Sequence, residues 1–121
     1  MRRQFARYAG VGVVATAAHY LALVLCVEWA GSPAWLGSGF GAALGAQVAY
    51  AGNRWFTFDH RGAMRASWPR FMLTALLGAL LGMVIVAFGV RLGLHYLIAQ
   101  VLATLAGLVL TFAINRAWTF R

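Results

Sequence analysis

The sequence predicts an all-α polytopic membrane protein with four transmembrane helices, formed by two parallel helical hairpin repeats of the same orientation. Of its 121 residues, 63% are hydrophobic and only 10% are charged, more apolar surface than a water-soluble domain of this size can hide. Four apolar stretches, each near the roughly 20 residues that cross a bilayer, occupy almost the whole chain. Their approximate bounds are 8–29, 35–52, 71–90 and 96–114. We therefore expect a single membrane domain over residues 1–121.

The breaks between the apolar stretches predict how the spans connect. Gly31-Ser32-Pro33 and Arg91-Leu92-Gly93 are short and rich in turn residues, which predicts two tight antiparallel hairpins. The middle loop, about Phe58 to Pro69, is longer and carries the remaining polar residues between the hairpins. No segment is left over for a soluble domain.

The basic residues are strongly biased to one side of the predicted membrane domain. All ten are arginine, and only Arg91 falls in the short loops, whereas nine accompany the termini and the middle loop. This bias predicts that both termini and the middle loop are cytoplasmic, and it disfavours an antiparallel dimer of subunits inserted both ways round. The formal charge of +8 suits anionic lipid head groups, and without a soluble fold it does not indicate nucleic acid. The nine are Arg2, Arg3, Arg7, Arg54, Arg61, Arg65, Arg70, Arg116 and Arg121.

An internal repeat relates the two halves of the chain. A shift of 62 residues aligns 31–58 with 93–120 without a gap, and the matches cluster at the end of each second span. Arg7-Tyr8 also matches Arg70-Phe71 after a one-residue gap. Because each repeat, about 5–58 and about 68–120, holds two spans, both copies have the same orientation about an axis along the membrane normal. The identities are Gly31/Gly93, Gly45/Gly107, Ala51/Ala113, Asn53/Asn115, Arg54/Arg116, Thr57/Thr119 and Phe58/Phe120.

Small residues four apart run along the second and fourth spans and end at an asparagine in each. Such spacing places them on one helix face, where another backbone can approach closely and the terminal amide is directed inward. Ordinary helix packing accounts for the ladders, and the shared asparagine is the functional suggestion. The ladders are Gly37, Gly41, Gly45, Ala49 and Asn53, and Ala99, Ala103, Gly107, Thr111 and Asn115.

The openings and endings of the repeats resemble the GtrA-like family of small four-span membrane proteins. The family pattern has a basic residue beside an aromatic residue at the start of each repeat, here Arg7-Tyr8 and Arg70-Phe71, and an N-R-x-[W]-x-F type ending. The endings here are Asn53-Arg54-Trp55-Phe56-Thr57-Phe58 and Asn115-Arg116-Ala117-Trp118-Thr119-Phe120, so the resemblance covers essentially the full length. One departure is that Trp55 aligns with Ala117 under the 62-residue shift, whereas Trp118 lies one place later. Equivalent roles for the two tryptophans are therefore not assumed.

The resemblance implies work on polyprenyl-phosphate sugars: translocation of a lipid-linked monosaccharide across the bacterial inner membrane, or assistance to the glycosyltransferase that makes it. Arginine suits a lipid phosphate because it stays charged and binds in a two-pronged fashion, although arginines at helix ends also serve as interfacial anchors. The expected phosphate ligands are Arg54, Arg116, Arg7 and Arg70. The amides of Asn53 and Asn115 are expected to bond sugar hydroxyls or to fix the neighbouring arginine. The expected aromatic interface comprises Trp55, Trp118, Phe58 and Phe120.

Three polar residues lie deeper in the predicted spans. Polar groups there usually face a bundle interior or a wet cavity, so we interpret His19, Gln47 and Gln100 as candidates for a polar cleft that takes the sugar head group. A competing interpretation of His19 is a neutral imidazole that is hydrogen-bonded between helices. Gln47 and Gln100 are not equivalent under the 62-residue shift.

Catalysis finds little support in the sequence. Glu28 and Asp59 are the only carboxylates and fall at opposite membrane faces, so no acid pair, metal-ligand cluster or activated nucleophile can be assembled. We expect a non-enzyme without cofactor or metal, and three hypotheses remain: a flippase, a scaffold that recruits or stabilises a glycosyltransferase, and a small multidrug exporter. The exporter ranks third, because it needs a carboxylate within a span. Four thin helices enclose little space, so we expect a homo-oligomer, with a dimer favoured.

Overall fold

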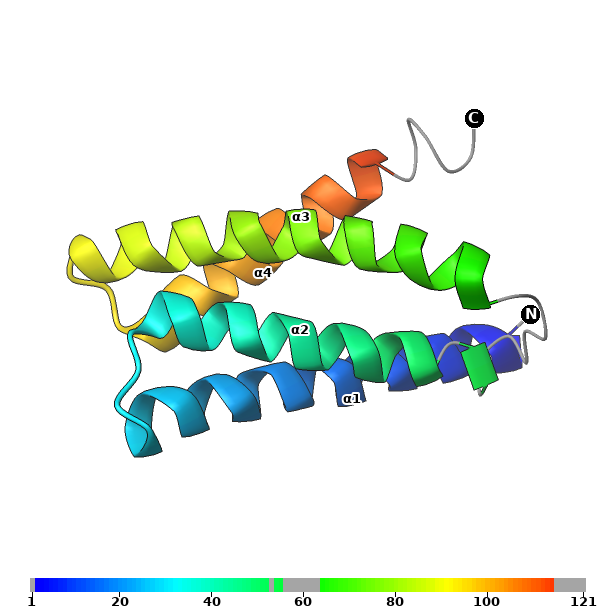
Figure 1. Ribbon diagram of the computed structural model, residues 1–121, viewed down its shortest axis with the longest axis horizontal. Helices are drawn as coiled ribbons and strands as arrows, with labels where there is room; N and C mark the ends of the chain where they lie inside the picture. Colours follow the sequence, from blue (N-terminus) through cyan, green and yellow to red (C-terminus); the bar gives the residue numbers. More distant parts are fainter. Residues whose placement is uncertain (1, 53, 56–63, 115–121) are drawn as a thin grey trace.

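The computed structural model describes residues 2–52, 54–55 and 64–114, and over these residues the chain is helical throughout apart from the short connections. The elements are α1 (Arg2–Val24), continued by the π-helical turn η1 (Leu25–Trp29), α2 (Ala34–Gly52), α3 (Met64–Arg91) and α4 (Tyr96–Ile114). Helices α1 and α2 form one antiparallel hairpin, α3 and α4 form the second, and α2 packs against α3 to join them (Figure 1). The all-α fold of two hairpins with one orientation is confirmed.

The two tight connections lie together at one end of the bundle, which we call the hairpin end. The N-terminus and the start of α3 lie at the opposite end, which we call the terminal end (Figure 1). Each tight connection turns at a glycine in the left-handed region, Gly31 with φ 69° and Gly93 with φ 93°. Residues with a Cβ rarely adopt this conformation, so these two positions need glycine. The predicted hairpin turns are confirmed.

The π-helical turn η1 explains the one-residue gap in the repeat alignment. At the end of α3 the backbone N–H of Leu94 donates to the carbonyl of Gly89, five residues back, at 2.9 Å. The equivalent bond in the first hairpin, from Ser32 to Cys26, also measures 2.9 Å but reaches six residues back. A π-helical turn holds one residue more than the α-helical turn it replaces. The extra residue of the first repeat is therefore absorbed in η1 without altering the hairpin turn that follows.

Helix α3 begins earlier than the sequence indicated. We expected the middle loop to continue to about Pro69, and this is wrong, because α3 starts at Met64 and Pro69 lies inside it. As the sixth residue of α3, Pro69 has no N–H to bond the carbonyl four residues before it, so the helix begins at Met64 with this one backbone bond missing. The helix therefore extends beyond the apolar stretch, as α1 does at its own start.

The helix lengths and the surface suit a membrane. The segments Ala9–Trp29 and Trp68–Arg91 are long and apolar enough to span one, and Tyr96–Leu110 is a shorter apolar stretch. Helix α2, with 19 residues, is about 28 Å long, close to the thickness of the hydrocarbon core. Large apolar side chains such as Val109, which is 70% exposed, cover the outside of all four helices. A surface of this kind is stable in lipid rather than in water.

The two hairpins pack differently along their length. In the first, a Cβ added at Gly41 would lie 2.5 Å from the carbonyl oxygen of His19, and one at Gly45 would lie 3.0 Å from that of Ala15. The predicted close approach along this ladder is confirmed. In the second hairpin, by contrast, no described atom lies within 4 Å of a Cβ added at Gly107, the equivalent of Gly45. Helix α4 therefore packs on α3 near the hairpin end and diverges from it toward the terminal end (Figure 1).

Candidate functional site

Three of the predicted phosphate ligands lie at the terminal end. Arg54 is half-buried in the helical turn that follows α2, and its guanidinium carbon lies 5.9 Å from the ring centroid of Trp55. This distance suits a cation–π contact, which holds the guanidinium at the interface. Arg7, near the start of α1, and Arg70, near the start of α3, are exposed. The Trp55 side chain is 60% exposed, as an interfacial aromatic would be.

The remaining predicted residues at the repeat endings lie outside the described part of the chain. Their roles stay predictions. They are Asn53, Asn115, Arg116, Trp118, Phe58 and Phe120.

Helical register places Arg7 on the outward face of α1. Arg7, Val14 and Leu21 are seven residues apart, which puts them on one face of the helix, and all three are exposed. The face that packs against α2 carries Val11 and Ala15, both buried. Arg7 therefore points toward the surroundings of the bundle and not into its interior.

A cluster of hydrogen-bonded polar side chains lies in the hairpin half of the bundle. Ser38 and Gln100 are each only 2% exposed, and the hydroxyl of Ser38 donates to Oε1 of Gln100 at 2.6 Å. The Gln100 amide nitrogen donates to Oγ1 of Thr104 at 3.3 Å, and the same Oγ1 lies 2.7 Å from the hydroxyl of Tyr20. We call Tyr20, Ser38, Gln100 and Thr104 the buried polar cluster. It connects α1, α2 and α4.

His19 adjoins this cluster with one ring nitrogen that lacks a partner. Its imidazole meets the ring of Tyr20 edge-on, with centroids 5.5 Å apart. Its Nε2 is buried and has no hydrogen-bond partner among the described residues. A buried polar atom without a partner costs free energy, which makes this nitrogen available to a ligand hydroxyl or to water.

The two glutamines occupy different seams of the bundle. Gln100 belongs to the buried polar cluster, whereas Gln47 is exposed on α2 beside α3. The indole nitrogen of Trp68 donates to Oε1 of Gln47 at 3.3 Å, and the Gln47 amide lies 3.1 Å from the sulfur of Met72. One amide is therefore held inside the bundle and the other at its lipid-facing surface.

Sequence reasoning missed three members of the buried polar cluster. Tyr20, Ser38 and Thr104 are common in membrane helices and carry no charge, so none stood out. One signal was present: Ser38 and Gln100 are 62 residues apart, the offset of the repeat, so a polar residue occupies the same position in both copies.

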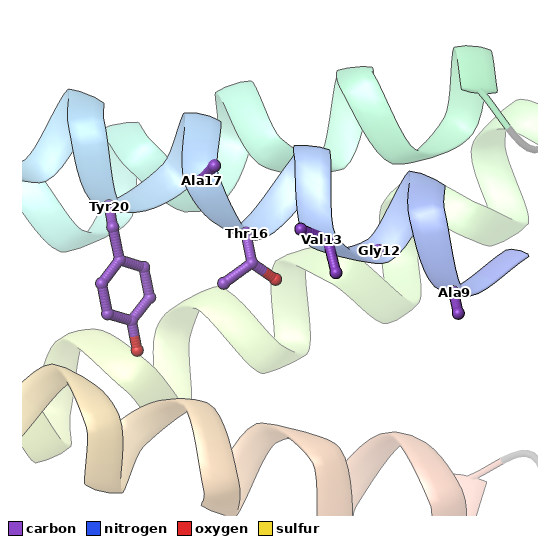
Figure 2. A pocket seen from close by; sticks show the side chains of 6 residues that line it. All are labelled: Ala9, Gly12, Val13, Thr16, Ala17 and Tyr20. Atoms are coloured by element: carbon purple, nitrogen blue, oxygen red, sulfur yellow. The ribbon is translucent and has the colours of Figure 1, made fainter.

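An open groove of about 580 Å³ runs along the side of α1 that faces α4 (Figure 2). The Tyr20 side chain reaches from α1 toward α4 and closes the groove at the hairpin side (Figure 2). At the hairpin end itself, the hydroxyl of Tyr96 donates to Oε1 of Glu28 at 2.9 Å. Helices α1 and α4 are thus bonded in the hairpin half and separate in the terminal half. The groove is lined by Ala9, Gly12, Val13, Thr16, Ala17 and Tyr20.

These features define a small polytopic membrane protein with arginines at one end and a polar cluster inside the opposite half. The family model described as GtrA/DPMS, transmembrane domain, matches residues 7–120, so the chain belongs to this family, as the repeat motifs predicted. No curated protein and no solved structure matches the chain.

Proposed function

We propose that this protein moves a polyprenyl-phosphate-linked monosaccharide across the bacterial inner membrane for glycosylation of a cell-surface polysaccharide. Membership of the GtrA/DPMS family supports a lipid-linked sugar as the substrate. The observation that carries the proposal is the seam between α1 and α4, which is bonded near Tyr20 and open beyond it. Such a seam lets a lipid enter sideways from one leaflet. The arginine bias supports an orientation with both termini in the cytoplasm.

The phosphate is bound by arginines of the terminal end. Arg54 is half-buried and held beside Trp55, so its guanidinium is preorganised for a planar, two-pronged contact with a phosphate. Arg116 holds the equivalent position in the second repeat, and Arg7 and Arg70 add positive charge at the same interface.

The sugar head group passes the buried polar cluster. Hydroxyl and amide groups of Ser38, Gln100 and Thr104 bond one another while the seam is closed, and they exchange these bonds for sugar hydroxyls when α4 moves away from α1. The unpartnered Nε2 of His19 offers one further bond. The proposal includes no catalytic step, cofactor or metal, and it has the protein act as a homo-oligomer, with a dimer favoured.

The test is transport of a labelled polyprenyl-phosphate sugar in liposomes that contain the purified protein. Arg54→Ala and Arg116→Ala should each slow transport about 10- to 100-fold, the loss of one charge-assisted hydrogen bond to phosphate. Arg54→Lys should restore part of the rate, because lysine keeps the charge without the two-pronged geometry. Arg91→Ala, at the hairpin end, is the matched control and should leave transport unchanged.

Two results would overturn parts of the proposal. Transport that does not depend on Arg54 or Arg116 would refute the phosphate site. Absence of transport by the intact protein, together with tight and specific binding to a polyprenyl-phosphate glycosyltransferase, would replace the flippase with a non-catalytic scaffold for that enzyme.

A further inference from the structure

The contact between α2 and α3 is the repeat equivalent of the contact between α4 and α1, but the two differ in how their side chains meet. Met72 of α3 contacts Gln47 of α2 at 3.1 Å. A Cβ added at Gly39 of α2 would lie 2.6 Å from the sulfur of Met83, so this methionine lies directly on the helix. Two methionines of α3 therefore contact α2 at different heights of this seam. In the equivalent seam, α1 leaves a groove.

The sequence itself encodes this difference. Residues of α3 correspond to residues of α1 that are 63 positions earlier, the offset that relates Arg70 to Arg7. Four of the six groove positions carry a smaller side chain on α1 than on α3, so the first repeat has less side-chain volume along this helix face. The four pairs are Ala9 for Met72, Gly12 for Ala75, Val13 for Leu76 and Ala17 for Leu80.

The groove suits a hydrocarbon chain better than a sugar. Of its six lining residues only Thr16 and Tyr20 carry a polar side-chain atom, and Tyr20 uses its hydroxyl to bond Thr104. From Ala9 to Tyr20 the helix advances 11 residues, or about 16 Å, half the thickness of the hydrocarbon core. A chain that enters at the terminal end would therefore run to the middle of the bilayer and stop against the Tyr20 ring.

A positive charge lies at the mouth of the groove. Arg2, Ala9 and Thr16 are seven residues apart and share one face of α1, and Arg2 is exposed. Its side chain is long enough to reach a head group at the interface while its methylene groups stay in lipid. An occupant with an anionic head and an apolar tail matches both parts of this face.

We infer that the groove binds the isoprenoid chain of a polyprenyl phosphate, which packs along α1 as far as Tyr20, while Arg2 adds positive charge to the phosphate site at the terminal end. The identity of the lipid class rests on the proposed function. The methyl branches of an isoprenoid chain make it bulkier than a straight acyl chain, and the positions without large side chains, Ala9, Gly12 and Ala17, supply the additional width.

The test fills the groove with the side chains that α3 carries at the same positions. Wild-type protein, Ala9→Met and Ala17→Leu are placed in nanodiscs of zwitterionic lipid and titrated with a long-chain polyprenyl phosphate. Each variant should bind about tenfold more weakly, which corresponds to the loss of contact with about two methylene groups. Ala43→Leu, the same change at an exposed position of α2, is the matched control and should bind as the wild type does.

A second measurement does not depend on affinity. A photo-crosslinking residue in place of Val13 should capture the polyprenyl phosphate, and the same residue in place of Ala43 should not. Because the added side chains enter open space, helical content and unfolding of the filled variants should match those of the wild type.

The outcomes separate this inference from the proposed function. Unchanged affinity in both filled variants, with arginine-dependent transport intact, overturns the chain site alone. Equal binding of polyprenyl phosphate and phosphatidic acid by the wild type overturns isoprenoid recognition. A loss of dimer in Ala17→Leu with unchanged lipid affinity identifies the groove as an interface between two copies, which also overturns the inference.

Discussion

Ser38 and Gln100 occupy the same position in the two repeats and are hydrogen-bonded to each other at 2.6 Å. Residues that a twofold axis relates can touch only where that axis passes between them. The pseudo-twofold axis of the two hairpins therefore runs through this bond, inside the hairpin half of the bundle. Because one partner is a serine and the other a longer glutamine, the network extends from the axis to Thr104 on one side only.

The bond on the axis should contribute measurably to stability. Ser38→Ala leaves Oε1 of Gln100 without its donor in a buried site, so the free energy of unfolding should fall by about 1–2 kcal/mol. The double variant Ser38→Ala/Gln100→Leu removes both partners and should show a coupling energy on the order of 0.6–1.7 kcal/mol. Reversible unfolding in mixed micelles measures both values.

The control for this cycle is Ser32→Ala. The hydroxyl of Ser32 donates to the neighbouring carbonyl of Pro33 at 3.3 Å on the exposed hairpin turn, and the alanine variant keeps the backbone bond to Cys26, so stability should change by less than about 0.5 kcal/mol. A coupling energy near zero between Ser38 and Gln100 would show that the bond on the axis does not form in the membrane.

The divergence of α4 from α3 predicts opposite effects for one substitution at two equivalent positions. Gly45→Ala places a Cβ 3.0 Å from the carbonyl oxygen of Ala15 and should destabilise the bundle by about 1–3 kcal/mol. Gly107→Ala enters open space and should stabilise it by about 0.5–1 kcal/mol through helix propensity. Thermal unfolding of the two variants checks this. Destabilisation by both would mean that α4 lies on α3 along its full length.

Much of the fold could be predicted from the sequence, because burial in lipid leaves a strong pattern. The apolar runs predicted that the second and fourth spans end at about Gly52 and Ile114, and α2 and α4 end at these residues. The start of α3 could not be predicted, because Pro69 reads as a loop residue and only the backbone shows that the helix tolerates it. The π-helical turn η1 could not be predicted from the sequence, which showed only a one-residue gap in the repeat alignment. The backbone bonds of the two hairpin turns are what assign this gap to η1.

The site could be predicted less well than the fold. Charge indicated Arg54 and the other arginines of the terminal end, since a guanidinium in an apolar chain is conspicuous. Tyr20 and Thr104 could not be identified, because their importance comes from contact between α1 and α4, which are 84 residues apart at this bond. The groove beside them could not be predicted either, because small residues such as Gly12 suggest ordinary helix packing, and only the structure shows that α4 separates from α1 at this height.

The π-helical turn predicts that α1 tolerates the deletion of one residue at one place. Deleting Val27 should convert η1 to an α-helical turn, keep the register of both flanking segments and leave the fold intact. Deleting Phe88 from α3 is the control, because this side chain is 60% exposed and α3 has no extra residue to lose. There the deletion rotates one part of the helix by about 100° relative to the other.

Circular dichroism and size-exclusion chromatography of the two deletion variants test this difference. The Val27 deletion should elute as the wild type does with unchanged helical content, and the Phe88 deletion should aggregate or lose helix. Equal tolerance of both deletions would contradict the assignment of the extra residue to η1.

The last prediction ranks two substitutions in the α1–α4 seam by the number of bonds that each removes. Tyr20→Phe removes one hydroxyl, and Thr104 Oγ1 then still donates to the carbonyl of Gln100 at 2.9 Å, so the cost should be about 0.6 kcal/mol. Thr104→Val also takes the acceptor from the buried amide of Gln100, so it should cost about 1–3 kcal/mol. Both variants are measured by reversible unfolding in mixed micelles. A larger effect of Tyr20→Phe than of Thr104→Val would mean that contact with α4, and not the Gln100 network, is what the seam depends on.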